Sequence, residues 1–197
     1  MKEIWESRYA EEEYVYGKEP NAYFKSFIDN AQPGKILLAA EGEGRNAVYA
    51  ALKGWEVYAF DQSENARNKA LNLAAKFNVS INYNICDYAD TAYDLNSFDA
   101  IGIFYFHLPE KEKAEAYDII FKYLKPKGKL IMEVFHKEQL VNKSGGPKDI
   151  DLLYDINEVE DLMKDFSYKK ICKETVNLDE GKLHQGSAIV IRVEAEK

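Results

Sequence analysis

The chain has 197 residues, of which 46% are hydrophobic and 30% are charged, a composition that suits a single domain with a sizeable core. Its 34 acidic residues outnumber 26 Lys and Arg residues, and the formal net charge of −8 disfavours nucleic acid and anionic membranes as partners. The sequence has no run of roughly 18 apolar residues for a membrane helix, no apolar signal segment, and no disulfide framework, since Cys86 and Cys172 stand in unrelated surroundings. We therefore expect one cytoplasmic domain over residues 1–197 that acts on a small molecule, either as a monomer or as a homodimer.

Residues 1–33 precede the first expected strand and are rich in aromatic side chains. Trp5, Tyr9, Tyr14 and Tyr16 would either form a helical lid over a binding site or staple an N-terminal helix to the domain. Residues 34–197 are expected to form an α/β core.

Short apolar runs alternate with helical patterns through most of this core. The apolar runs are bounded by turn residues and are expected to be strands. They cover residues 35–40, 56–60, 79–86, 98–105 and 129–135. Helices are expected over 46–53, over 63–77 with Ser63 as N-cap, and along a stripe of Ala114, Tyr117, Phe121 and Leu124. This alternation is typical of a doubly wound, mostly parallel α/β sheet.

The last part of the chain has a different pattern. A helix near residues 157–165 is followed by two extended runs, 168–176 and 187–194, which are separated only by a loop that contains glycine. Because no helix separates these two runs, we expect them to pair antiparallel at an edge of the sheet.

The first two strands carry the parts of a nucleotide site. The first strand leads into Gly42-x-Gly44 at the start of a helix, where small residues let a ligand approach the backbone. Asp61 follows 19 residues after Gly42, where its carboxylate would accept the hydroxyls of a ribose, and Asp87 after the third strand would bond an adenine amine. The same spacing, with Ala47 in the third position, also satisfies the dinucleotide fingerprint. The residues alone therefore predict an adenosine-containing cofactor without deciding which one.

Longer motifs resemble a known family. The segments that carry the resemblance are Trp5-x-x-x-Tyr9, Glu13 to Asn21, Gly42 to Tyr49, Asp61-x-Ser63, Lys69-Ala70, His107-Leu108-Pro109, Gly145 to Asp149, Glu180-Gly181 and His184-x-Gly186. They are similar to class I S-adenosylmethionine-dependent methyltransferases, and in particular to the branch of the tellurite-resistance methyltransferases.

The resemblance implies a Rossmann-like methyltransferase fold with a seven-stranded sheet whose last strand is antiparallel. It also implies S-adenosylmethionine as cofactor, S-adenosylhomocysteine as product, and a small-molecule acceptor with a soft nucleophile, such as a chalcogen oxyanion or a thiol. The expected cofactor-binding residues are Tyr16, Glu41, Gly42, Glu43, Gly44, Arg45, Asn46, Asp61, Gln62, Ser63, Asp87, Tyr88 and Tyr105.

The chain departs from the wider family at two positions. Leu38 stands where most members have an acid, and Ala40 stands where most have a glycine. The acid near the amino-acid end of the cofactor is therefore missing, and Glu41 or a residue of the N-terminal segment is expected to replace it.

Methyl transfer needs alignment and exclusion of water more than a dedicated base. Three residues are nevertheless expected to act at the acceptor, namely His107 after the fourth strand, Glu133 in the fifth strand and His184 in the tail. The alternative for each histidine is a structural role, and the alternative for Glu133 is a buried pair with Lys or Arg. Gly145-Gly146-Pro147 is expected to form a loop over the substrate opening.

Other chemistries find little support in the sequence. It has no zinc-binding His-Glu-x-x-His, no Gly-x-Ser-x-Gly elbow and no phosphate loop, and Asp149-Ile150-Asp151 is too short to predict a metal. Two alternatives stay open. One is a nicotinamide-dependent oxidoreductase, and the other is a nucleotide-sensing module without catalysis.

Overall fold

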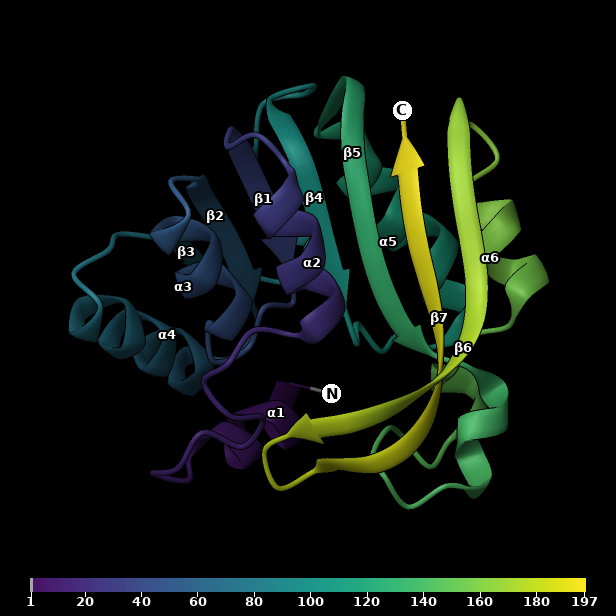
Figure 1. Cartoon of the computed structure of the whole chain (residues 1–197), viewed down its shortest axis with the longest axis horizontal. Coiled ribbons are helices and arrows are strands. Elements are labelled where there is room, and N and C mark those ends of the chain that lie inside the picture. Colours follow the sequence, from purple (N-terminus) through teal and green to yellow (C-terminus); the bar gives the residue numbers. More distant parts are fainter. Residues whose placement is uncertain (1) are drawn as a thin grey trace.

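The computed structural model of the chain describes residues 2–197, and its centre is one seven-stranded sheet (Figure 1). The strands are β1 (Lys35–Ala39), β2 (Glu56–Asp61), β3 (Asn82–Ile85), β4 (Phe98–Phe104), β5 (Leu124–Phe135), β6 (Tyr168–Glu180) and β7 (His184–Glu196). Their order is β3-β2-β1-β4-β5-β7-β6, and only the pairings of β7 with β5 and β6 are antiparallel. The expected doubly wound sheet with an antiparallel last strand is confirmed.

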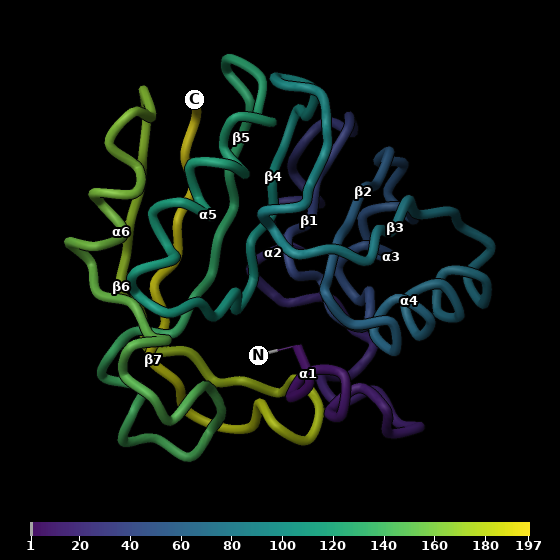
Figure 2. Tube along the Cα trace, turned by 180° about the vertical axis from the view of Figure 1, so that it is seen from behind, coloured from purple at the N-terminus to yellow at the C-terminus, as the bar shows by residue number. Residues whose placement is uncertain are grey.

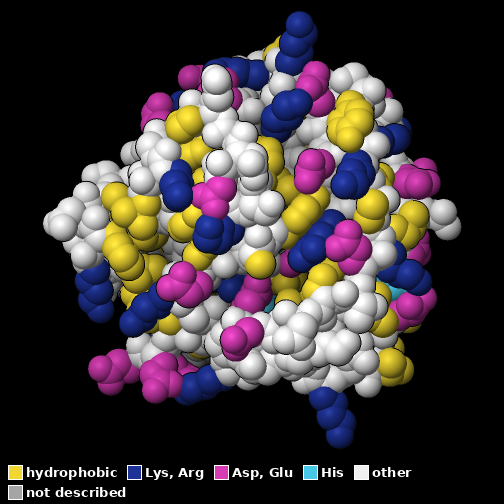
Figure 3. All heavy atoms as spheres, viewed as in Figure 1, with side chains coloured by type: hydrophobic (Ala, Val, Ile, Leu, Met, Phe, Trp, Pro, Cys, Tyr) yellow, Lys and Arg dark blue, Asp and Glu magenta, His cyan; other side chains and the backbone are white. Residues whose placement is uncertain are grey.

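Helices cover both faces of the sheet. They are α1 (Lys2–Tyr9), α2 (Ala22–Asn30), α3 (Arg45–Leu52), α4 (Glu64–Lys76), α5 (Glu110–Lys122) and α6 (Ile156–Leu162). Helices α2, α3 and α4 share one apolar cluster with β1, β2 and β4, whereas α5 and α6 share another with the opposite face. Figure 2, from behind, shows α5 and α6 in front of β5 and β6. On the face seen in Figure 3, Lys and Arg side chains are interspersed with Asp and Glu.

Local sequence accounts for most of these elements. In β1, Ile36 and Leu38 point to one cluster and Leu37 to the other, so both sides of the strand are buried, as expected of a central parallel strand. The Ser63 side chain accepts a hydrogen bond from the Ala66 N–H at 3.1 Å, which confirms it as the N-cap of α4.

Three elements differ from expectation. Strand β3 begins at Asn82 rather than at residue 79, and α5 ends at Lys122, so that Leu124 belongs to β5. The buried face of α5 contains Lys113 instead of Ala114, because the Lys113 ammonium bonds the Leu153 carbonyl at 2.6 Å. A long charged side chain can lie on an apolar face when its head finds such partners, and hydrophobic spacing does not show this.

The hairpin of β6 and β7 is longer than the two expected runs and curls out of the sheet toward α1 (Figure 1). At its tip the Lys182 N–H donates to the Val15 carbonyl at 3.0 Å. Gly181 is required at this contact, because a Cβ there would lie 2.3 Å from the Val15 oxygen. The hairpin tip and the N-terminal segment therefore meet at the carboxyl edge of the sheet.

Two parts of the N-terminal segment lie in different places. Helix α1 lies at the carboxyl edge near the hairpin tip (Figure 2), whereas α2 packs on the sheet through Phe24 and Ile28. Of residues 2–33, α1 and the segment that follows it are therefore the part that lies at the carboxyl edge, and a lid formed by them stays a prediction.

Candidate functional site

A cavity of about 500 Å³ opens at the carboxyl ends of β1, β2 and β4. This volume lies in the range of small-molecule and cofactor sites. Most residues expected from the sequence line it, namely Tyr16, Glu41, Gly42, Glu43, Arg45, Asn46, Asp61, Gln62, Asp87, Tyr88, Tyr105, His107 and His184. Gly44, Ser63 and Glu133 are not part of the lining.

The turn after β1 forms one wall of the cavity. Gly42 has a φ of +63°, and a Cβ there would lie 2.8 Å from the Tyr9 hydroxyl. Glycine is thus needed both for the left-handed backbone and for the close approach of α1. The turn leads directly into the N-terminus of α3, whose N-cap is Gly44.

Asp61 ends β2 beside this turn. Its carboxylate accepts from the Gly42 N–H at 3.1 Å and from the Ser63 N–H at 3.0 Å, so Ser63 orients Asp61 without lining the cavity. Burial raises the pKa of Asp61 to about 6. A carboxylate fixed in this way is suited to accept hydroxyl donors from a ligand.

The two glutamates of the turn have different surroundings. Glu43 is buried and forms an ion pair with Lys69 at 2.6 Å. Glu41 accepts from the Ala47 N–H at 2.7 Å, and burial raises its pKa to about 7. Ala40, directly before Glu41, has a φ of +50°, a backbone region that disfavours residues with a Cβ.

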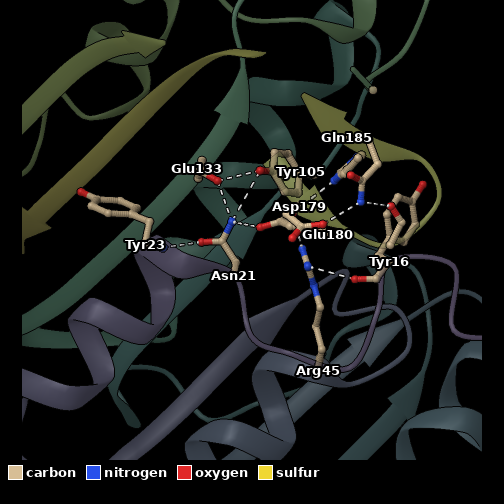
Figure 4. Close-up of polar contacts among 12 residues, drawn as sticks. Tyr16, Asn21, Tyr23, Arg45, Tyr105, Glu133, Asp179, Glu180 and Gln185 are labelled. Carbon is tan, nitrogen blue, oxygen red and sulfur yellow. Dashed lines mark hydrogen bonds and ion pairs between the residues drawn. The ribbon is translucent and has the colours of Figure 1, made fainter. Parts of the chain in front are cut away.

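A network of buried polar groups connects the cavity wall to the hairpin (Figure 4). Glu180 of β6 pairs with Arg45 at 2.9 Å and accepts from the Asn21 amide at 3.0 Å. Asn21 also donates to Glu133 at 2.6 Å. Burial opposes ionisation of Glu180, but its hydrogen bond with His184 and the charge of Arg45 lower its pKa to about 2.

Glu133 is the centre of this network rather than a cavity residue. Its carboxylate accepts from the Tyr105 hydroxyl at 2.7 Å and from the Arg192 Nε at 2.6 Å, in addition to Asn21. Figure 4 shows the carboxylate between Asn21 and Tyr105. The pairing with an arginine, the alternative from sequence, is therefore what the structure contains, and Glu133 can influence the cavity only through Tyr105 and Asn21.

Aromatic rings enclose the end of the cavity next to the hairpin. The His184 ring lies 4.6 Å from Tyr16 and 4.7 Å from Tyr105, measured between ring centroids. The His107 ring is stacked with Trp5 of α1 at 6.5 Å and with Phe135 at 5.9 Å. We name the five lining residues Trp5, Tyr16, Tyr105, His107 and His184 the aromatic pocket.

Both histidines of the aromatic pocket are held in the neutral form. Burial and the nearby His184 lower the pKa of His107 to about 3. Burial also lowers the pKa of His184, although its hydrogen bond to Glu180 opposes this. The His107 Nδ1 atom is shielded from solvent and has no hydrogen-bond partner among residues 2–197. The ring therefore lines the cavity through its other atoms.

The third histidine and the glycine-rich loop lie elsewhere. His136 is not in the lining, and its Nδ1 accepts from the Glu138 N–H at 3.1 Å. At Gly145 a Cβ would lie 2.7 Å from the His184 ring, so this loop packs behind His184.

Several lining residues carry no motif that sequence reasoning could assign. Phe104, Phe106 and Cys86 line the cavity because they end or follow β4 and β3 at the carboxyl edge. The signal that could have identified these residues is their position at strand ends, because ligands bind at the carboxyl ends of the strands in an α/β sheet. Asn21 and Glu180 belong to segments of the family resemblance, but their contact with each other joins residues 159 positions apart in the chain.

Comparison with known proteins identifies a domain in the chain. Residues 36–128 match the family model described as a methyltransferase domain. The chain carries a methyltransferase domain over this segment. Among proteins with curated descriptions, none matches this sequence.

Solved structures show the same fold at low identity. One, reported for the conversion of a disulfide bond into a thioacetal group during echinomycin biosynthesis, has a TM-score of 0.79 and 12% identity, covering 99% of this chain and 91% of its own. TehB from Haemophilus influenzae has a TM-score of 0.75 and 16% identity, and the match covers 100% of this chain and 66% of TehB. Phosphoethanolamine N-methyltransferase 2 from Haemonchus contortus was solved with S-adenosyl-L-methionine. It has a TM-score of 0.71 and 17% identity, and the match covers 98% of this chain and 56% of that protein.

The residues of the cavity fit an adenosine-containing cofactor. The anchored carboxylate of Asp61 and the turn at the N-terminus of α3 are features that an adenosine needs, and the cavity continues beyond them into the aromatic pocket. Among residues 2–197 no cluster of side chains is arranged to hold a metal ion, and no helix is long and apolar enough to cross a membrane.

Proposed function

We propose that the protein is an S-adenosylmethionine-dependent methyltransferase that acts on a small molecule with a soft nucleophilic atom, and that the acceptor binds in the aromatic pocket. The observation that carries the proposal is the enclosure of neutral His107 and His184 by aromatic rings at one end of the cofactor cavity. Such a pocket favours a polarisable, poorly hydrated atom over a strongly hydrated one.

Within this proposal, the cofactor occupies the part of the cavity between the β1 turn and the end of β3. Asp61 accepts the ribose hydroxyls, Asp87 accepts from the adenine amine, and the backbone of the turn from Gly42 to Asn46 lies along the cofactor. Gln62 and Tyr88, which follow Asp61 and Asp87 and line the cavity, complete this part of the site. The sulfonium then faces the aromatic pocket, where ring faces attract a cation.

The charges around the pocket favour a thiol over a chalcogen oxyanion as acceptor. Arg45, the buried cation closest to the pocket in the network, is already paired with Glu180. Both pocket histidines are neutral, and Glu41, Asp61 and Asp87 line the same cavity. Two cations near the pocket have no ion pair among the described residues, Lys2 in the lining and Arg8 over the Trp5 ring, but both belong to α1 and neither is fully buried. An anion with full negative charge would therefore lose its hydration without a buried cation in return, whereas a thiol loses little.

The bound cofactor supplies a methyl group that is already activated on a sulfonium. The chain's own residues would align the acceptor, exclude water and take up its proton. The neutral His107 ring, which lines the pocket, accepts the hydrogen of the acceptor thiol, and His184 binds beside it on Phe135. Glu133 acts as a positioning residue, because it fixes the Tyr105 hydroxyl and the Asn21 amide.

A methyl-transfer assay with isotopically labelled cofactor tests the proposal. Small alkyl and aryl thiols, selenite, tellurite and phosphoethanolamine are compared at equal concentration. We expect labelled product with the thiols, and a loss of about 100-fold in rate for His107→Asn. Labelled product only with the amine or the oxyanions would contradict the acceptor class. Tight binding of S-adenosylhomocysteine without turnover on any acceptor would favour the non-catalytic sensing module instead.

A further inference from the structure

Helix α1 brings positive charge to the border of the aromatic pocket. Lys2 lines the cavity, and the Arg8 side chain contacts two residues of the pocket, Trp5 and Tyr16. We propose that the acceptor is a thiol that also carries a carboxylate, and that Arg8, assisted by Lys2, binds this carboxylate at the border of the pocket. The carboxylate site rests on the proposed function, because it belongs to the thiol acceptor that is methylated there.

The Arg8 guanidinium is held in place and has donors to spare. Its Nη1 atom donates to the Tyr16 hydroxyl at 2.9 Å, and its Cζ atom lies 4.6 Å from the centroid of the Trp5 ring. The side chain is half-buried, and among residues 2–197 it forms no ion pair. A guanidinium has five N–H donors in a fork that matches a carboxylate, so donors remain for two parallel hydrogen bonds with a ligand.

Arg8 and His107 belong to the same end of the cavity. Trp5 contacts both, since its ring is stacked with the His107 ring at 6.5 Å and packs against the Arg8 guanidinium. Burial has the largest effect in lowering the pKa of His107, and the charge of Arg8 adds to it. A small molecule with its carboxylate at Arg8 can therefore place a thiol, at the other end of a short chain, beside His107.

The exposure of the two cations suits a carboxylate that stays at the border of the pocket. Lys2 is exposed and Arg8 is half-buried, so a carboxylate beside them keeps part of its hydration while the uncharged thiol enters the aromatic pocket. One acid, Glu112 of α5, also lines the cavity and would favour an ammonium group on the acceptor instead. The sign of the charge that the acceptor carries is therefore what an experiment has to decide.

The carboxylate takes no part in the chemical step. The thiol sulfur takes the methyl group, its proton passes to the His107 ring, and S-adenosylhomocysteine is the second product. Because the carboxylate forms the same contacts before and during this step, its effect is expected in KM rather than in kcat.

Three thiols of similar length test the sign of the charge. They are 3-mercaptopropionate, 3-mercaptopropanol and 2-mercaptoethylamine, which carry a negative, no and a positive charge away from the sulfur. For the wild-type protein, KM should be about tenfold lower for the acid than for the alcohol, the effect of charge-assisted hydrogen bonds, and highest for the amine. The difference should shrink as salt is added. A KM for the alcohol or the amine that is equal to or lower than that for the acid would overturn the proposal.

Substitutions in α1 assign the effect to residues. Arg8→Gln keeps a donor for the Tyr16 hydroxyl but removes the charge, so KM should rise about tenfold for the acid and stay within about twofold for the alcohol. Lys2→Gln, at an exposed position, should raise KM for the acid only about twofold. The control is Lys76→Gln on α4, which removes the same charge outside the cavity lining and should change neither KM. Equal increases for the acid and the alcohol in Arg8→Gln would show that Arg8 only holds α1 in place, against the proposal.

Calorimetry with S-adenosylhomocysteine separates this site from the cofactor site, because that ligand has a carboxylate of its own. Its affinity for Arg8→Gln should stay within about twofold of the wild-type value. A tenfold loss would place Arg8 at the cofactor and contradict the proposal. If the wild-type protein methylates no thiol, the proposed function fails, and the carboxylate site fails with it. If it methylates the acid and the alcohol with the same KM, the carboxylate site alone fails.

Discussion

The cofactor part of the cavity and the aromatic pocket are built in different ways. The cofactor part comes from consecutive strand ends within residues 36–128, the segment that matches the methyltransferase domain model. The aromatic pocket adds Trp5 and Tyr16 from before that segment and His184 from after it. In the proposed arrangement, a shared strand–turn–helix pattern is enough for the cofactor, whereas the acceptor depends on the N-terminal segment meeting the hairpin tip. Fold neighbours with this architecture can share a cofactor and differ in acceptor.

The largest expected effect concerns the ion pair that joins these two parts. Arg45→Met should lower the free energy of unfolding by about 3 to 5 kcal/mol, because it leaves Glu180 buried without its cation. Denaturation with guanidinium chloride measures this. The control is Lys129→Met, since Lys129 pairs with Glu196 at the surface and should contribute less than about 1 kcal/mol. Equal, small losses in both variants would show that the two parts are not coupled through Arg45.

Next in size is an effect confined to the aromatic pocket. His107→Asn should reduce the rate of methyl transfer by about 100-fold, as expected when a proton acceptor is removed. Its affinity for S-adenosylhomocysteine should change by less than about twofold, since His107 lies at the acceptor end. Steady-state kinetics and calorimetry on the same preparation measure the two quantities. His136→Asn, outside the cavity lining, serves as control. A loss of cofactor affinity equal to the loss of rate would contradict the division of the cavity.

A pH titration addresses the cofactor part alone. The pKa of Asp61 is raised to about 6 by burial, and ribose hydroxyls bind its ionised form. The affinity for 5′-methylthioadenosine should therefore be constant above about pH 6 and fall below it, by up to about tenfold per pH unit. Calorimetry between pH 8 and pH 5 measures this. Asp61→Asn should remove the dependence, and a dependence that survives in this variant would assign it to another group.

The smallest expected effect concerns the backbone of the β1 turn. Ala40 has a φ of +50°, and Ala40→Gly should raise the free energy of unfolding by about 0.5 to 1 kcal/mol, because glycine adopts this conformation without strain. Urea denaturation of the protein without ligand measures the change. A destabilised variant would mean that the greater freedom of glycine in the unfolded chain outweighs the strain at Ala40.

The sequence predicted which residues line the cofactor part of the cavity, because the signals for them are local. Gly42, Asp61 and Asp87 each follow a strand, and parallel strands end at a common edge. Ser63 was predicted at the right place as a helix cap, but its effect on the cavity goes through its N–H to Asp61, which motif spacing does not show. Whether these residues bind the cofactor as expected is for the experiments above to decide.

The hairpin tip and the partners of Glu133 could not be derived from local sequence patterns. Residues 177–186 are mostly polar and contain glycines, so they predicted a loop. Contact with Val15 makes them the tip of a hairpin. Glu133 stood out as a carboxylate in an apolar strand, but its partners Asn21 and Arg192 lie 112 and 59 residues away. Partners so distant in the chain become known only from the folded structure.

Calorimetric titration of the wild-type protein and of Asp61→Ala with S-adenosylhomocysteine tests the central claim most directly. The account predicts binding by the wild type and a loss of about 1.5 to 3 kcal/mol in the variant, the contribution of hydrogen bonds to a charged carboxylate. A nicotinamide dinucleotide, titrated in parallel, should not bind. Binding of the dinucleotide without binding of S-adenosylhomocysteine, or an unchanged affinity in Asp61→Ala, would contradict the account.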